Sequence, residues 1–147
     1  MENEPDISVF RPDRPGIRKV LGDLEADIME VIWARPAANG TTVREVFEIL
    51  YEGRSIAYTT VMTTMKRLAK KRLLRAKKRD QAFVYYPSFT RDEFILRFVG
   101  RVLEDLLVSF AGPTFDRLDK LPDQQAAERA RRLLGEISRR RAEDEQA

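Results

Sequence analysis

The chain has 147 residues, and its 43% apolar and 35% charged side chains suffice for one folded domain or slightly more. It contains neither cysteine nor histidine, which excludes disulfides, thiolate nucleophiles and zinc fingers and removes the usual general base and metal ligand. An enzyme is therefore the least favoured class, and we expect no cofactor and no metal site. No apolar stretch approaches about 18 residues and no leader pattern follows Met1, so we expect a cytoplasmic protein without membrane insertion.

The net charge of +3 is unevenly distributed along the chain. Residues 41–80 hold eleven basic and four acidic side chains, a net charge of +7, whereas residues 1–40 carry −3 and residues 91–147 carry −1. A basic block confined to one segment indicates a nucleic-acid partner better than a basic average does.

The first 19 residues contain three prolines, one glycine and scattered charges without a hydrophobic period. This pattern predicts a flexible N-terminal tail over residues 1–19. The alternative is a basic arm that reaches a phosphate backbone or a minor groove, formed by Arg11, Arg14, Arg18 and Lys19. We favour the tail, because most terminal segments of this kind have no such role.

Two helices are expected next. Apolar residues recur at helical spacing over 21–34, where Trp33 should anchor the core with a partner for its indole N–H. The second helix begins at Thr42-Val43-Arg44-Glu45, a capping box in which the threonine hydroxyl and the glutamate each satisfy a free amide. Gly53 should end it.

The stretch AYTTVMTTMKRLAKKRLL predicts a third helix over 57–72. A 100° step places four side chains on its buried side, namely Tyr58, Val61, Met65 and Leu68. The exposed side combines short hydroxyl groups with cations: Thr59, Thr60, Thr63, Lys66, Arg67 and Lys70. Thr64 flanks the core and is expected to be a boundary residue.

Alternating residues then predict a β-hairpin over 74–87 around a turn at Arg79-Asp80-Gln81. Of Tyr85 and Tyr86, we expect one in the core and the other on the strand surface rather than in base stacking. Three short helices followed by a hairpin, with the basic charge in the third helix and the hairpin, describe a mainly α winged helix-turn-helix domain over residues 20–89.

The exposed side of the third helix suits a duplex groove. Threonine hydroxyls can contact phosphates or base edges, their methyl groups can touch a thymine methyl, and cations contact phosphates. A solvated basic surface is the ordinary alternative for such a helix alone, but the continuation of the cations into the hairpin favours DNA. The predicted DNA-binding residues are Thr59, Thr60, Thr63, Lys66, Arg67, Lys70, Lys71, Arg75, Lys77, Lys78 and Arg79.

Residues 90–147 are expected to form a helical dimerisation domain. A capping box at Thr90-Arg91-Asp92-Glu93 opens a helix of about 20 residues, whose apolar side covers an arc of about 220°, more than one neighbour requires. The predicted dimer contacts are Ile95, Val99, Val102, Leu103, Leu106, Leu107 and Phe110. Gly112-Pro113 should break this helix before a short one to Leu121. A last helix from Pro122 should present a stripe of Ala126, Ala130, Leu133, Leu134 and Ile137.

The stretches LGDLEADIMEVIW, TTVREVFEIL, AYTTVMTTMKRLAKKRLL and FVYYPSFTRDEF resemble the BlaI/MecI/CopY (penicillinase repressor) family of bacterial transcriptional repressors. The resemblance covers about residues 20–110, and the third-helix stretch is its most specific part. It implies a homodimer in which each winged helix reads half of a palindromic operator, with TACA/TGTA-like halves. It also implies a sensor system that often includes a membrane metalloprotease.

Two departures from the family pattern leave the inducing signal open. Copper-responsive relatives carry C-terminal cysteines, and this chain has none. β-Lactam-responsive staphylococcal relatives are cleaved at an Asn-Phe bond, but the matching stretch LRFVGRVLEDLL contains no asparagine. Two alternatives therefore stay open beside a proteolytically induced repressor: a winged helix used as a protein-interaction module, and a regulator that responds to a small molecule.

Overall fold

The computed structural model describes residues 4–120 and, beyond them, positions 125, 128, 129, 131, 132, 135, 136 and 139, which are helical. The chain forms two compact units, one up to Ile95 and one from Leu96 onward. The stripe predicted for the last helix, like Leu121, lies outside the described residues. Within the described part of the chain, no helix combines the length and the apolar character needed to cross a membrane.

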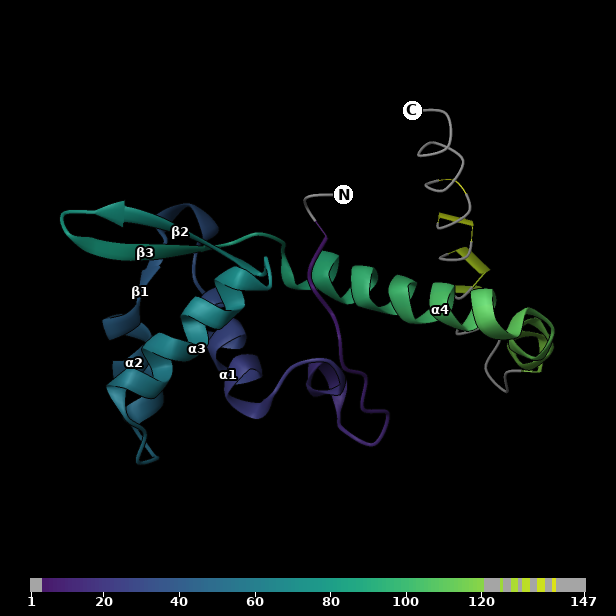
Figure 1. Ribbon diagram of the computed structural model, residues 1–147, viewed down its shortest axis with the longest axis horizontal. Coiled ribbons are helices and arrows are strands. Elements are labelled where there is room, and N and C mark those ends of the chain that lie inside the picture. Colours follow the sequence, from purple (N-terminus) through teal and green to yellow (C-terminus); the bar gives the residue numbers. More distant parts are fainter. Residues whose placement is uncertain are drawn as a thin grey trace. The chain divides into compact units, whose positions relative to one another are not determined.

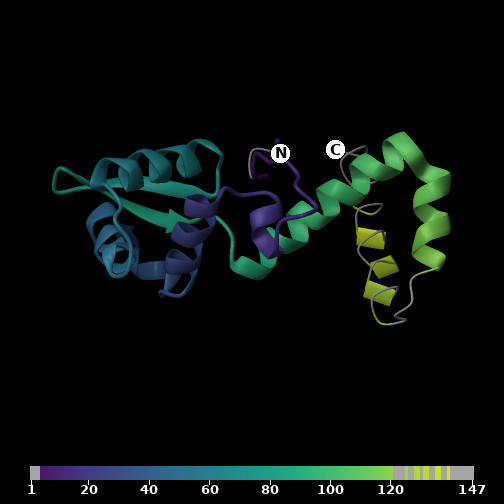
Figure 2. The same cartoon turned by 90° about the horizontal axis from the view of Figure 1, so that it is seen from below.

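The order of elements confirms the predicted winged-helix fold class (Figure 1). Helices α1, α2 and α3 pack against one another and against an antiparallel sheet with the strand order β1-β3-β2. The hairpin of β2 and β3 projects beyond the helices as the wing (Figures 1 and 2). The elements are η1 (Gly16–Lys19), α1 (Asp23–Trp33), η2 (Ala37–Asn39), β1 (Thr41–Thr42), α2 (Val43–Tyr51), α3 (Tyr58–Lys70), β2 (Leu74–Arg79), β3 (Ala82–Pro87) and α4 (Arg91–Asp119), where η denotes a 3-10 helix.

Both predicted capping boxes are confirmed. The Thr42 hydroxyl accepts from the Glu45 amide at 3.2 Å, and the Glu45 carboxylate accepts from the Thr42 amide at 3.1 Å. Thr90 and Glu93 repeat this arrangement at the start of α4. Strand β1, which pairs Thr41 with Tyr85, was not predicted, because two residues are too short for an alternating pattern.

The first turn of α4 belongs to the N-terminal unit. The Trp33 indole N–H donates to the Phe89 carbonyl at 2.9 Å, which confirms the predicted partner, and the indole ring lies 5.6 Å from the ring of buried Phe94. This aromatic contact carries the compact unit to Ile95, six residues past the boundary expected from the sequence.

Residues 4–19 make contacts with the rest of the unit that the sequence did not predict. Residues 16–19 form η1, and Ile17 is only 6% exposed. Arg14 pairs with Asp23, and Arg18 pairs with both Asp23 and Asp27 in the first half of α1. Burial of an isoleucine, together with three ion pairs, offsets the entropy of ordering a short segment.

Helix α4 is interrupted two residues earlier than expected. Phe110 has φ −143° and ψ 59°, so two helices meet there rather than at Gly112. Pro113 has no N–H to donate, and its ring collides with the carbonyl four residues earlier, so the distortion falls on the preceding turn. The Thr114 hydroxyl donates to the Phe110 carbonyl at 2.6 Å, which supplies a hydrogen bond at the break.

The wing ends in a tight two-residue turn. Asp80 and Gln81 both have positive φ, 49° and 69°, as the twist of a two-residue hairpin requires. At its base, Gly40 lies against the β3 side chains, where a Cβ would come within 2.9 Å of the Tyr86 ring. Gly40 also has φ 69°, so both backbone and space require glycine there.

Candidate nucleic-acid interface

Helix α3 presents one apolar and one polar face. Val61, Met65 and Leu68 are fully buried against the rest of the unit. In Figure 2, the teal helix α3 runs along one side of the unit, with α1 and α2 on the other side. The structure exposes the six side chains predicted for its outer face, namely Thr59, Thr60, Thr63, Lys66, Arg67 and Lys70.

Two residues at the edges of this face need separate description. Thr64 is 5% exposed, and its hydroxyl donates to the Thr60 carbonyl at 2.7 Å, so it belongs to the buried boundary. The prediction that Tyr58 is buried is wrong, because its side chain is 44% exposed. Tyr58 is the first residue of α3, beyond the core, and its ring packs edge-on against Phe47 at 5.5 Å.

A hollow of about 490 Å³ lies beside the polar face of α3. Its walls come from the first turn of α1, which contributes Asp23 and Glu25, and from threonines and Arg67 of α3. Ala57, the N-cap residue of α3, offers no side-chain cap, and the first turn of the helix contains no acidic residue. Its positive dipole end is therefore open to an anion at the edge of the predicted DNA face.

Lys71 differs from the other predicted DNA-binding cations. Its ammonium donates to the Glu25 carboxylate at 2.9 Å, and Glu25 also accepts from the Gly22 amide at 2.9 Å. Burial raises the pKa of Glu25, but these two donors, together with the nearby charge of Arg67, outweigh it and lower the pKa below its usual value. Glu25 is therefore ionised at neutral pH, and Lys71 is its counter-ion.

The hairpin register sorts the wing cations by face. Arg75, Lys77 and Arg79 lie on one face of β2, and Lys78 lies on the other, opposite Phe83. The Lys77 ammonium lies 5.5 Å from the centre of the Tyr86 ring, a cation–π contact.

The two tyrosines of β3 also separate by face. Tyr85 is buried, and burial raises the pKa of its phenol. Tyr86 is partly exposed. This arrangement confirms that one tyrosine is core and the other lies on the strand surface.

The cations of the N-terminal unit divide sharply by their partners. Most of those outside α3 and the wing are in ion pairs: Arg14, Arg18, Arg35, Arg44, Arg54 and Arg91. By contrast, seven predicted DNA-binding cations have no ion-pair partner anywhere in the described part of the chain, namely Lys66, Arg67, Lys70, Arg75, Lys77, Lys78 and Arg79. Unpaired cations thus gather on α3 and the wing, where they are available to phosphates.

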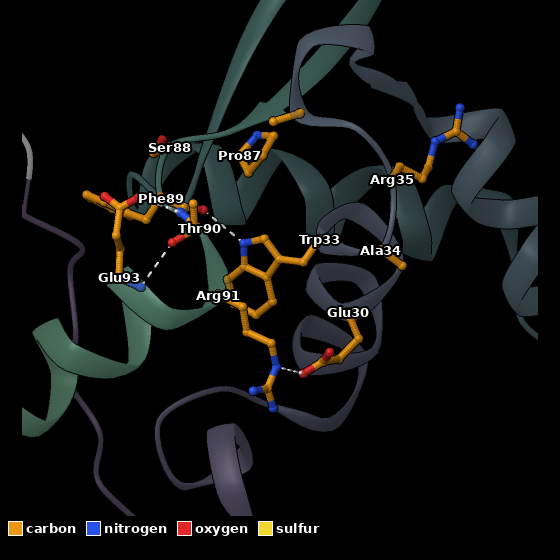
Figure 3. A pocket seen from close by; sticks show the side chains of 11 residues that line it. Glu30, Trp33, Ala34, Arg35, Pro87, Ser88, Phe89, Thr90, Arg91 and Glu93 are labelled. Atoms are coloured by element: carbon orange, nitrogen blue, oxygen red, sulfur yellow. Dashed lines mark hydrogen bonds and ion pairs between the residues drawn. The ribbon is translucent and has the colours of Figure 1, made fainter.

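A second hollow, of about 440 Å³, lies around Trp33 (Figure 3). Its charged groups already have partners inside the domain: Arg91 pairs with Glu30, and Glu93 accepts from the Thr90 amide. Because these groups satisfy one another, the hollow does not by itself favour the small-molecule alternative.

Comparison with known proteins decides the family. Residues 21–128 match the model described as "Penicillinase repressor". The chain belongs to the penicillinase repressor family. This confirms the resemblance seen in the sequence. The family consists of transcriptional repressors, which are not enzymes. The expectation that this protein is not an enzyme is therefore also confirmed.

Curated relatives match half of the chain or more. A protein named "Transcriptional regulator BlaI" from Mycobacterium tuberculosis, strains CDC 1551 / Oshkosh and ATCC 25618 / H37Rv, is 47% identical over 75 residues, or 51% of this chain. That match covers 53% of the relative, so the chain spans about half the length of these mycobacterial relatives. The "Penicillinase repressor" of Bacillus licheniformis is 28% identical over 98 residues, covering 61% of this chain and 74% of the relative.

The seven side chains predicted to form dimer contacts on α4 are not fully buried in the structure. Ile95, Val99, Val102, Leu103 and Leu107 are half-buried, and Leu106 is exposed. Phe110 is 61% exposed and stands at the helix break rather than inside a regular turn.

Sequence reasoning missed Glu25 as a residue of this region. Its position in the first turn of α1 predicts only a favourable interaction with the helix dipole. In the structure, it also forms an ion pair with Lys71 at the C-terminal end of α3. The spacing of 46 residues between Glu25 and Lys71 gives no local signal.

Proposed function

We propose that this protein is a homodimeric, sequence-specific transcriptional repressor that binds a palindromic operator through α3 and the wing. The observation that carries the proposal is the gathering of unpaired cations on α3 and the wing, around an exposed threonine face. The printed names of the relatives, a transcriptional regulator and a penicillinase repressor, support it.

In this proposal, the two parts of the surface have different tasks. Thr59, Thr60 and Thr63 lie in the first half of α3, the part of a recognition helix that approaches base edges. The cations from Lys66 onward and those of the wing contact phosphates, which orients the domain without reading sequence. Lys71 is the exception, because it already neutralises Glu25.

Two substitutions on α3 test the division of tasks. Thr63→Ala should reduce the preference for the operator over random duplex by roughly tenfold, as the loss of one base contact does. Lys70→Ala should weaken both duplexes about equally and make the salt dependence of log K shallower by about 0.9. Fluorescence anisotropy titrations at several salt concentrations measure both quantities. If neither substitution alters binding, the proposed DNA face is wrong.

The dimer is proposed to form through the partly exposed apolar side of α4. Val99→Asp or Leu103→Asp should give a monomer, because an unpaired carboxylate in an apolar interface is costly. Sedimentation velocity measures the change, and Arg101→Asp, on an exposed position of the same helix, is the matched control. If the sedimentation coefficient is unchanged in both interface variants, the dimer interface does not lie on this side of α4.

The inducing system is a further part of the proposal. By resemblance, a membrane metalloprotease would serve as the sensor that ends repression. Cleavage would have to occur at a bond other than Asn-Phe, since residues 96–107 contain no asparagine.

A further inference from the structure

Three parts of the N-terminal unit meet at the C-terminal end of α3. Lys71 is the cap residue of that helix, and its ammonium donates to Glu25 in the first turn of α1. The backbone carbonyl of the same lysine accepts from the Asp6 amide at 2.9 Å, so the N-terminal segment holds it as well. One residue thus ties the end of α3 to two other parts of the unit.

Glu25 is placed to act on α3 rather than on solvent. It is 7% exposed, and its two oxygens have separate donors, the Gly22 amide and the Lys71 ammonium. A carboxylate at this depth must keep both donors, since a buried charge without partners is strongly destabilising. Its position therefore fixes where the end of α3 can lie relative to α1.

Glu25 also borders the surface that is proposed to read DNA. It lines the same hollow as Thr60, Thr63 and Arg67. A shift of α3 against α1 would therefore move the threonines with respect to the groove. The neighbouring Lys70 has the same charge but is exposed and has no ion-pair partner among the described residues.

We propose that Glu25 and Lys71 form a positioning pair that holds α3 in the orientation needed to read the operator, and that Lys71 makes no phosphate contact. This inference rests on the proposed DNA-binding function. It predicts that breaking the pair lowers operator preference and leaves the number of phosphate contacts unchanged. Loss of a true phosphate contact has the opposite signature, because it reduces affinity for all sequences and the salt slope together.

The experiment compares adjacent lysines on two duplexes. The specific probe is a duplex enriched by the wild-type protein from a pool with a randomised centre, and the second probe is a random duplex of equal length. Lys71→Met should reduce the ratio of the affinities for the specific and the random duplex by roughly tenfold, which is the discrimination that one base contact provides. Its salt slope should equal that of the wild type. Lys70→Met, the matched control, should keep the preference and lose about 0.9 of the slope.

Two further variants separate positioning from simple destabilisation. Glu25→Gln and the double variant Glu25→Gln/Lys71→Met should lose preference to the same extent as Lys71→Met, because coupled residues are not additive. Lys71→Arg can still pair with Glu25 and should retain the preference. Partial unfolding would instead lower the active fraction on both probes equally, and thermal melts monitored by circular dichroism give that fraction.

The outcomes distinguish this inference from the function on which it rests. If the wild-type protein enriches no sequence and binds no duplex, the proposed function fails. If the wild type is specific but Lys71→Met behaves as Lys70→Met does, Lys71 is a phosphate contact and the positioning pair is overturned. Full operator preference in Glu25→Gln would overturn it equally.

Discussion

The N-terminal segment and the α3-wing surface are both rich in cations, but they use them in opposite ways. In the segment, Arg14 and Arg18 are engaged by carboxylates of α1, and the Lys19 ammonium donates to the Pro12 carbonyl at 3.0 Å. On α3 and the wing, cations from Lys66 to Arg79 have no carboxylate partner among the described residues, apart from Lys71. Cations therefore have two different physical roles in these two regions.

The difference teaches that the number of cations alone does not point to a DNA surface, and that the proposed surface is instead marked by cations without carboxylate partners. A cation held by a carboxylate has already released its share of counterions and gains little from a phosphate. The ion pairs of Arg14 and Arg18 with α1 argue against the basic-arm interpretation of residues 11–19.

The largest effect should come from the wing. Arg75→Ala/Lys77→Ala/Arg79→Ala removes the three unpaired cations on one face of β2 and should make the salt slope shallower by about 2.7, weakening binding at physiological salt by roughly two orders of magnitude. Lys78→Ala removes a single wing cation from the opposite face, so it should make the slope shallower by only about 0.9 in the same anisotropy assay. A loss from this single variant that equals or exceeds that of the triple variant would contradict the expected contribution of each cation.

Low pH should reduce the difference between the two regions, because protonation of the carboxylates disrupts their ion pairs with cations. Glu25 has its pKa lowered in the folded state, so its pair with Lys71 contributes stability that is fully present above about pH 5. That contribution is lost as the pH falls through the folded-state value, below the ordinary 4.5. As the pH is lowered from 6 to about 3, the melting temperature should therefore decrease less steeply for Glu25→Gln than for the wild type. Parallel curves would show that the pair contributes no pH-dependent stability.

A smaller effect concerns Arg72, an unpaired cation with a strained backbone. It follows the end of α3 with φ 67°, and the amides of Arg72 and Leu73 donate back to the Ala69 and Leu68 carbonyls, as in a Schellman motif. Arg72→Gly should raise the free energy of unfolding by about 0.5–1 kcal/mol, because glycine adopts this conformation without strain. Arg72→Ala removes the same charge without relieving the backbone, so denaturant titration should show no gain for it.

The smallest effect on DNA binding should come from the N-terminal segment. Arg14→Gln/Arg18→Gln should leave the salt slope unchanged, because neither guanidinium is expected to contact phosphate. The same anisotropy titrations measure the slope. A slope shallower by about two would restore the basic arm as a DNA-binding element.

Local patterns predicted what local interactions decide. The capping boxes at Thr42 and Thr90, the apolar face of α3 and the hairpin over 74–87 all follow from residues close together in the chain. The exposed threonine face was also predictable, because Val61, Met65 and Leu68 fix the rotation of the helix about its axis.

Interactions between distant residues, and those at helix ends, were not predictable in this way. The pairing of Lys71 with Glu25 depends on how α3 packs against α1, which no sequence period encodes. Tyr58 was misplaced because a helical wheel assumes a buried neighbour along the whole helix, while its first residue lies beyond the core. The break at Phe110 was placed two residues late, since proline disturbs the turn before it.

Gly40 limits how this wing could be reused in protein engineering. Its backbone fills the space that a side chain would need beside Val84 and Tyr86, and those two residues belong to the strand that joins the hairpin to β1. If this hairpin were grafted onto another winged helix, it would therefore pack correctly only where the host has glycine at the matching turn. To transfer the wing, two segments would have to be moved together: residues 74–87 and the turn before β1.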